Sequence, residues 1–117
     1  MGLQPDVENL MMRRPIHPIH PGEVLAEQLA VLNLTAASAA RDLHVPPSRI
    51  YQLLAGKRAM TADTVLRLER WLGVSAAFWM NLQMTYKLDC ASEEIGAEIQ
   101  RTVRPRRPEQ SATPAFS

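Results

Sequence analysis

Hydrophobic residues along the chain recur mostly at three- and four-residue spacing, which is the period of an amphipathic α-helix. Leu25, Leu29 and Leu32 form such a stripe after Pro21, and proline suits the first turn of a helix, so the pattern predicts a helix over residues 21–32. β-Branched and aromatic residues alternate with polar ones over only a few positions, so strand signals are nearly absent. The pattern therefore predicts an all-α fold.

Two short helices are predicted to follow the first. Thr35 is a suitable N-cap for a helix that ends at Leu43. Pro47 forces Pro46 into an extended conformation and itself has the backbone angle of a first helical position. The next helix is therefore predicted from about Pro47 to Ala55, and the glycine that follows is a typical residue at a helix C-terminus.

Two further helices complete the predicted domain. Thr61 is expected to cap the fourth helix, whose apolar stripe continues to Gly73. Ser75 is expected to cap the fifth helix, which would reach about Leu88. Apolar residues spaced by four indicate another, separate helix over residues 90–103.

Both ends of the chain differ in composition from the middle. Prolines recur in residues 1–20, and the last residues are rich in proline, serine, threonine and arginine, so neither end can bury a core. A chain of 117 residues has room for one domain of ordinary size. We therefore expect a flexible arm over residues 1–20, a helical domain over residues 21–89, and an extension over residues 90–117 that is first partly helical and then disordered.

Composition excludes several classes of protein. The longest central run without charge has sixteen residues, fewer than the ~20 apolar residues of a membrane-spanning helix. The N-terminal residues contain no apolar core of a secretory signal, and the single cysteine, Cys90, has no partner for an internal disulfide. We therefore expect a cytoplasmic protein that does not contact membranes.

The formal net charge of +1 hides an uneven distribution of charge. In residues 34–58 the cations outnumber the anions, with Arg41, Arg49, Lys57 and Arg58 against Asp42 alone. A local basic excess is expected of a surface that contacts nucleic acid, and equally of a solvated surface without a partner.

The second and third predicted helices form a helix-turn-helix pattern around His44-Val45-Pro46. Ala40 is small where the two helices would cross, while Ile50 and Leu53 supply the inward face. The outward face of the later helix carries side chains that can hydrogen-bond base edges or phosphates from the major groove, namely Ser48, Arg49, Tyr51 and Gln52. His44 occupies a turn position that commonly needs a left-handed conformation. Helical bundles that bind no DNA also contain such hairpins.

Five motifs occur in a characteristic order between residues 15 and 88. They are Ile19-His20-Pro21-Gly22-Glu23-Val24-Leu25, Val45-Pro46-Pro47-Ser48-Arg49-Ile50, Gly56-Lys57-Arg58, Thr61-Ala62-Asp63-Thr64 and Phe78-Trp79-Met80-Asn81-Leu82-Gln83. Together they resemble the HigA-type antitoxins of the lambda-repressor-like (XRE) helix-turn-helix class. The resemblance implies a lambda-repressor-like five-helix domain in a bacterial, nucleoid-associated protein. It also implies that the protein binds and neutralises a RelE-like, mRNA-cleaving HigB toxin and represses its own operon.

The resemblance further implies which residues contact DNA. The later helix of the hairpin would be the recognition helix, the N-terminus of the earlier helix would meet a phosphate, and two cations would reach the DNA backbone. The residues concerned are Thr35, Ala36, Pro47, Ser48, Arg49, Tyr51, Gln52, Lys57 and Arg58. Ala36 stands where the wider class commonly has a glutamine, so the phosphate contact there would come from backbone N–H groups and Thr35.

A homodimer is also implied, because the family usually dimerises through its C-terminal helices. The candidate interface residues are Phe78, Trp79, Leu82 and Tyr86. Two adjacent aromatic residues cannot both point into the centre of one small domain without widening its apolar face, so we expect at least one to meet a second subunit, with core packing as the alternative. A twofold dimer predicts an inverted-repeat operator with half-sites ~10 base pairs, or a multiple of that, apart.

Other kinds of chemistry find little support. The three histidines lack a carboxylate pattern that would assemble them into a metal site, and no nucleophile motif or phosphate-binding loop occurs, so we expect neither enzyme activity nor a cofactor. A stand-alone XRE-type repressor without a toxin partner is the alternative function, and a helical bundle that binds only proteins is a further one. Met11 and Met12 are candidate start codons besides Met1.

Overall fold

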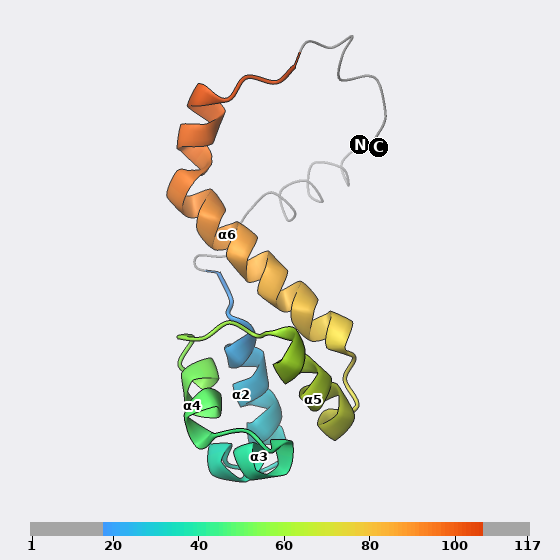
Figure 1. Cartoon of the computed structure of the whole chain (residues 1–117). Coiled ribbons are helices and arrows are strands. Elements are labelled where there is room, and N and C mark those ends of the chain that lie inside the picture. The colour runs from blue at the N-terminus through green and yellow to red at the C-terminus, as the bar shows by residue number, and fades with distance from the viewer. Residues whose placement is uncertain (1–17, 107–117) are drawn as a thin grey trace, which may run out of the picture.

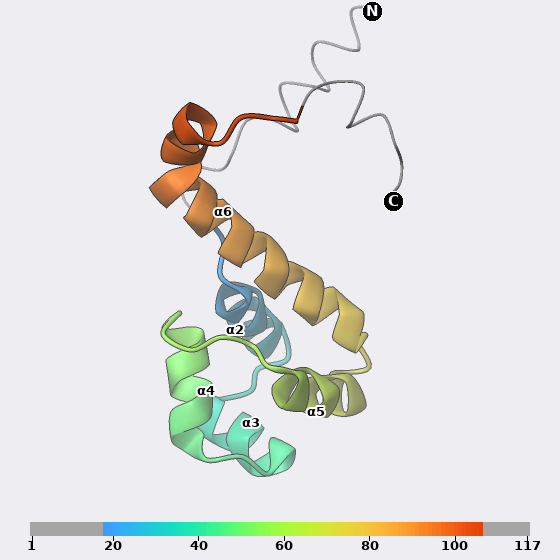
Figure 2. The same cartoon turned by 45° about the horizontal axis from the view of Figure 1, so that its top comes forward.

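The structure, a computed structural model, describes residues 18–106 and is helical throughout that range, apart from short connections. The helices are α2 (Pro21–Val31), α3 (Ala36–Leu43), α4 (Pro47–Leu54), α5 (Ala62–Leu72) and α6 (Ala76–Thr102). The four shorter helices form a compact group, and α6 packs on it with its first half and projects beyond it with its second (Figure 1, Figure 2). The all-α prediction is confirmed for the described residues. The predictions for residues 1–17 and 107–117 lie outside them.

Side-chain caps define where most of these helices begin. The hydroxyl of Thr35 accepts from the backbone N–H of Ser38 at 3.0 Å, and that of Ser75 accepts from Phe78 at 3.1 Å. Pro46 is extended, as predicted, with a φ of −63° and a ψ of 142°. Thr61 occupies the N-cap position of α5, but its side chain makes no capping hydrogen bond to the backbone.

The turn between α3 and α4 depends on a left-handed residue. His44 has a φ of 59° and a ψ of 48°, the conformation expected at this position of a helix-turn-helix. The Val45 N–H then donates to the Ala40 carbonyl at 3.1 Å, which closes the end of α3. Gly73 ends α5 in the same conformation, with a φ of 82°.

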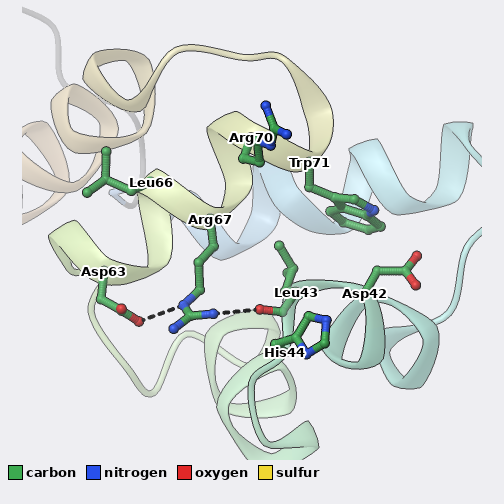
Figure 3. Close-up of a pocket in the computed structure, with 8 residues that line it drawn as sticks. All are labelled: Asp42, Leu43, His44, Asp63, Leu66, Arg67, Arg70 and Trp71. Carbon is green, nitrogen blue, oxygen red and sulfur yellow. Dashed lines mark hydrogen bonds and ion pairs between the residues drawn. The ribbon is translucent and has the colours of Figure 1, made fainter.

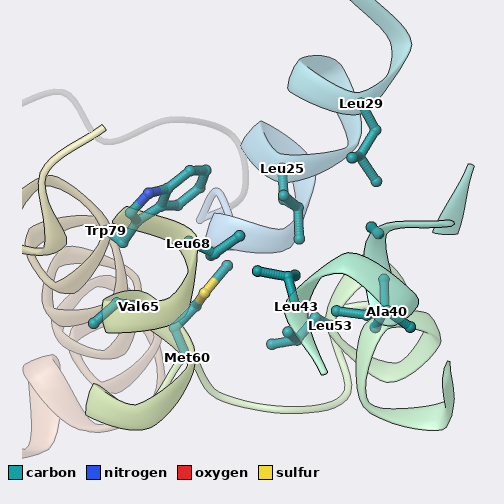
Figure 4. Close-up of a cluster of buried hydrophobic side chains, with 11 residues drawn as sticks. Leu25, Leu29, Ala40, Leu43, Leu53, Met60, Val65, Leu68 and Trp79 are labelled. Atoms are coloured by element: carbon teal, nitrogen blue, oxygen red, sulfur yellow. The ribbon is translucent and has the colours of Figure 1, made fainter. Parts of the chain in front are cut away.

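The hydrophobic core lies where the five helices of residues 18–106 meet (Figure 4). Its members are almost fully buried and come from every helix and from the α4–α5 loop; they are Leu25, Leu29, Ala39, Ala40, Leu43, Ile50, Leu53, Met60, Val65, Leu68 and Trp79. Burial of each large apolar side chain contributes ~1.5–3 kcal/mol, so this cluster is the main source of stability. Ala40 is 1% exposed, which agrees with the small side chain predicted where α3 and α4 cross.

Helix α6 departs from the prediction of two separate helices. It runs without interruption for 27 residues from Ala76 to Thr102, so the expected break near Leu88 is wrong and the expected boundary at residue 89 falls inside a helix. No proline interrupts this stretch, and the single Gly96 costs only ~1 kcal/mol relative to alanine. None of the helices in residues 18–106, α6 included, is both long enough and apolar enough to cross a membrane.

Candidate nucleic-acid interface

Helix α4 presents a polar face to solvent on one side of the domain. Ile50 and Leu53 anchor the helix in the core, and the residues between them point outward because they lie about 100° away around the helix. Of the nine predicted DNA contacts, seven are exposed: Thr35, Pro47, Ser48, Tyr51, Gln52, Lys57 and Arg58. Ala36 and Arg49 are partly buried. Tyr51 is 56% exposed, although an aromatic ring of this size is usually covered.

The N-terminus of α3 leaves backbone donors available. The hydroxyl of Thr35 takes up the N–H of Ser38, and the hydroxyl of Ser38 in turn accepts from the N–H of Thr35 at 3.2 Å. Helix geometry gives the N–H groups of Ala36 and Ala37 no acceptor within the helix. Both groups lie where the helix dipole favours an anion, so they can bind a phosphate without the glutamine that Ala36 replaces.

Arg49 takes part in an ion-pair network between the hairpin and α5. Its Nη1 lies 2.7 Å from Oδ2 of Asp63, and the same oxygen lies 3.1 Å from Nε of Arg67. Hydrogen bonds from Arg67 and then Arg49 lower the pKa of Asp63 below its usual value. Arg67 also donates from Nη1 to the Leu43 carbonyl at 2.9 Å (Figure 3). A guanidinium carries five N–H donors, so Arg49 can hold Asp63 and contact DNA with the same group.

Hydrogen bonds join the loop after α4 to the exposed polar face of that helix. Nε of Arg58 donates to Oε1 of Gln52 at 2.9 Å, which joins the loop to the exposed side of α4. The Lys57 N–H donates to the Gln52 carbonyl at 2.9 Å, so Lys57 and Arg58 both start from fixed main-chain positions. Two cations therefore lie beside the exposed face of α4. If this face contacts bases, the DNA backbone runs close to both cations.

The four predicted dimer residues have different environments. Trp79 is 0% exposed and packs in the core of its own chain, so its assignment to a dimer interface is wrong. Phe78 packs edge-to-face against the indole with 5.3 Å between centroids. Phe78 is 42% exposed, whereas Leu82 and Tyr86 are half-buried. Phe78 is therefore the most exposed of the four.

His20 and Gln83 are buried polar residues, and the side chain of each accepts a hydrogen bond from a backbone N–H. The sequence patterns gave neither residue a role. His20 is 5% exposed and caps α2, because its Nδ1 accepts from the Gly22 N–H at 2.8 Å. Gln83 of α6 is also buried, and its Oε1 accepts from the Met60 N–H at 2.7 Å. Both residues belong to the motifs quoted above, but a motif alone does not show which backbone group a side chain binds.

A groove of about 520 Å³ lies beside this interface, between the end of α3 and the outer side of α5 (Figure 3). It is lined by Asp42, Leu43, His44, Asp63, Leu66, Arg67, Arg70 and Trp71. Both acidic and basic side chains line this groove. Residues 18–106 contain no group of three histidine, cysteine or acidic side chains that could hold a metal ion.

The packed pair α3 and α4, with a left-handed turn and an exposed polar recognition face, defines a helix-turn-helix DNA-binding domain. Comparison with known proteins agrees, since the family model described as helix-turn-helix matches residues 25–79. Virulence-associated protein I of Dichelobacter nodosus is 46% identical over 77 residues, which cover 65% of this chain and 71% of that protein.

Solved structures narrow the classification further. An addiction module antidote protein of the HigA family from Coxiella burnetii matches with a TM-score of 0.75 and 42% identity, over 77% of this chain and 99% of that chain. Antitoxin HigA of Pseudomonas aeruginosa, solved with the higBA promoter, matches with a TM-score of 0.76 and 36% identity, over 78% of this chain and all of that chain (100%). The chain belongs to the XRE-type helix-turn-helix family and groups within it with the HigA antitoxins.

Proposed function

We propose that the protein is the antitoxin of a HigB/HigA-type toxin–antitoxin module. It represses its own operon by binding promoter DNA as a dimer, and it binds and neutralises a RelE-like, mRNA-cleaving toxin. The observation that carries the DNA-binding part is the exposed polar face of α4 flanked by Lys57 and Arg58. A related antitoxin HigA has been solved with its promoter, which supports the same role here.

The proposed contacts divide between DNA bases and backbone. Tyr51 and Gln52 lie on the exposed face of α4, where a helix in the major groove meets base edges. Oε1 of Gln52 accepts from Arg58, but a carbonyl oxygen has two lone pairs, so the amide can still bind a base. The N-terminus of α3 and the cations after α4 contact phosphates, which set the position of the protein on the duplex.

Dimerisation is proposed through α6. Phe78 is exposed near its start, and a stripe of exposed apolar residues follows, comprising Met84, Leu88, Ile95, Ile99 and the C-cap residue Val103. Their spacing of four, seven, four and four residues keeps them on one side of the helix. A groove of about 350 Å³ lies on the same stripe around Ser92 and Gly96, where small side chains let a second helix approach closely. A twofold dimer of this kind binds an inverted repeat.

The first test is a titration of the purified protein against its own upstream promoter and against a scrambled duplex, at two salt concentrations. We expect tight, promoter-selective binding that weakens with salt, because phosphate contacts release counterions. The variant Tyr51→Ala/Gln52→Ala should lose selectivity, while Glu27→Ala on α2, exposed and outside the predicted contacts, serves as the matched control. Weak and equal binding to both duplexes by the unaltered protein would contradict the repressor role.

The toxin partner needs a separate test. The short reading frame next to this gene should encode a basic protein that co-purifies with the antitoxin, and its mRNA cleavage should stop when the antitoxin is added in equal amount. Promoter-selective binding without any such complex would instead support the stand-alone repressor.

A further inference from the structure

His20 lies at a junction of three parts of the fold, directly before α2. Its imidazole contacts the start of α2 through the Gly22 N–H, lies against Gly56 in the loop after α4, and meets the ring of Tyr86 on α6. The rings of His20 and Tyr86 meet edge-to-face, with 4.8 Å between centroids and 74° between planes. The side chain is buried, so these contacts replace water around the ring.

The two ring nitrogens have different partners. Nδ1 accepts from the Gly22 N–H at 2.8 Å, which requires that Nδ1 carry no proton. A neutral imidazole then carries its proton on Nε2, and this is the nitrogen that can donate to the main chain of Arg58. A side chain needs both an acceptor and a donor to make these two contacts at once.

Close backbone packing keeps the loop against the imidazole. A Cβ built on Gly22 would lie 1.8 Å from the carbonyl oxygen of Leu53, so the start of α2 touches the last turn of α4. Gly56 follows that turn with a φ of 73°, and a Cβ there would lie 3.8 Å from Cγ of His20. The His-Pro-Gly motif therefore packs directly under the loop that carries Lys57 and Arg58.

We propose that His20 is a positioning residue for DNA binding: it holds the Gly56–Arg58 loop so that Lys57 and Arg58 face the phosphate backbone, and it links this loop to α6 through Tyr86. The proposal rests on the proposed function for the phosphate contacts. It assigns to the His-Pro-Gly motif a role in the geometry of the interface, in addition to starting α2.

The variant His20→Asn separates the two roles of the ring. Asparagine is a good N-cap and can still accept from the backbone of α2, but it is too short to reach both Arg58 and Tyr86. We expect promoter affinity to fall about tenfold and the slope of log affinity against log salt to decrease by about one, as for the loss of one phosphate contact. Scrambled DNA should lose affinity by the same factor, because phosphates carry no sequence information.

Two controls distinguish positioning from general destabilisation. Ser75→Ala removes the cap of α6 and should lower Tm without changing the salt slope. If His20 acts through the loop, adding His20→Asn to Arg58→Ala should reduce affinity by much less than His20→Asn does alone. An unchanged affinity and slope in His20→Asn, or fully additive losses in the double variant, would overturn the proposal.

A readout without DNA keeps the proposal testable if the protein does not prefer its promoter. The Gly56 N–H donates to Leu53 and the Lys57 N–H to Gln52, at 3.0 and 2.9 Å, so both amides should exchange slowly with solvent. We expect faster exchange at these amides in His20→Asn and in Tyr86→Ala, which leaves His20 intact, and little change in Tyr86→Phe. Unchanged exchange in both would exclude a positioning role, whereas a lack of promoter selectivity in the unaltered protein would reject only the proposed function.

Discussion

Arg49 combines an ion pair within the fold with a proposed contact to DNA. Sequence periodicity placed it on the outward face of the recognition helix, and the structure adds that Asp63 of α5 binds its Nη1 at 2.7 Å. A charged pair of this kind restricts the long arginine side chain before DNA arrives. Less conformational entropy of the side chain is then lost on binding, which favours the complex.

Replacing Arg49 by alanine should weaken operator binding by ~1–3 kcal/mol, because a bidentate contact between arginine and guanine has about that value. Binding assays on operators with single base changes should show relaxed preference at one position. An equal loss on every sequence would identify a phosphate contact instead. Asp63→Asn breaks the ion pair and keeps the guanidinium, so it should weaken binding less than Arg49→Ala.

The adjacent aromatic residues make a second prediction at this scale. Trp79→Ala should lower the free energy of unfolding by ~3–5 kcal/mol, because it empties a fully buried site. Phe78→Ala should cost about 1 kcal/mol or less in the monomer, because the ring is partly exposed. Chemical denaturation of both variants at low protein concentration measures the difference, and similar losses would show that Phe78 also belongs to the core.

At the level of elements, the long helix α6 combines two tasks along its length. Its first half contributes Trp79 and Gln83 to the domain, and its second half projects from the domain (Figure 2). This second half carries exposed apolar side chains. An exposed apolar stripe on a projecting helix is typical of a surface that binds another helix. Helix α6 therefore connects the stability of the domain with its proposed assembly.

The variant Ile99→Glu should dissociate the proposed dimer, because it places a charge in the middle of the apolar stripe. Ile99 is 45% exposed and outside the core cluster, so the monomer should keep its helical content. Ala97→Glu adds the same charge on the opposite side of the same turn and should leave the dimer intact. Sedimentation velocity distinguishes the two, and a dimer that persists in Ile99→Glu would place the interface elsewhere.

For the whole molecule, stability depends on a buried histidine that is neutral in the folded state. Burial lowers the pKa of His20 below its usual value of 6.5, while the hydrogen bond to the Arg58 main chain and the nearby Glu23 carboxylate partly oppose the shift. In the unfolded chain the imidazole has its ordinary pKa, so the unfolded state binds a proton first as the pH falls. Protonation also removes the acceptor that caps α2.

Stability should therefore be complete above pH 6.5 and should decrease as the pH falls through the lowered pKa of folded His20. Thermal unfolding between pH 7.5 and 5 would measure this decrease. His20→Asn has no imidazole at this site and should show a weaker dependence over the same range. Equal pH dependence in both proteins would assign the effect to other groups.

The sequence alone was sufficient to predict the helices and the helix-turn-helix, because both depend on local physics. Apolar spacing, N-caps such as Thr35, and the conformational limits of Pro46 and Pro47 act within a few residues. The left-handed His44 was also expected, because most helix-turn-helix units have a glycine at this turn position. Resemblance to a family then predicted that the outward residues of α4 contact DNA.

Only the tertiary structure decided which side chains face inward at long range. Periodicity could not tell that Trp79 is buried while Phe78 is accessible, because each choice fits one helix and only the packing of α5 on α6 distinguishes them. The proposed role of His20 likewise depends on two neighbours, Gly56 and Tyr86, that lie 36 and 66 positions away along the sequence. Contacts between distant segments leave no periodic signal in a single sequence, so they appear only once the chain is folded.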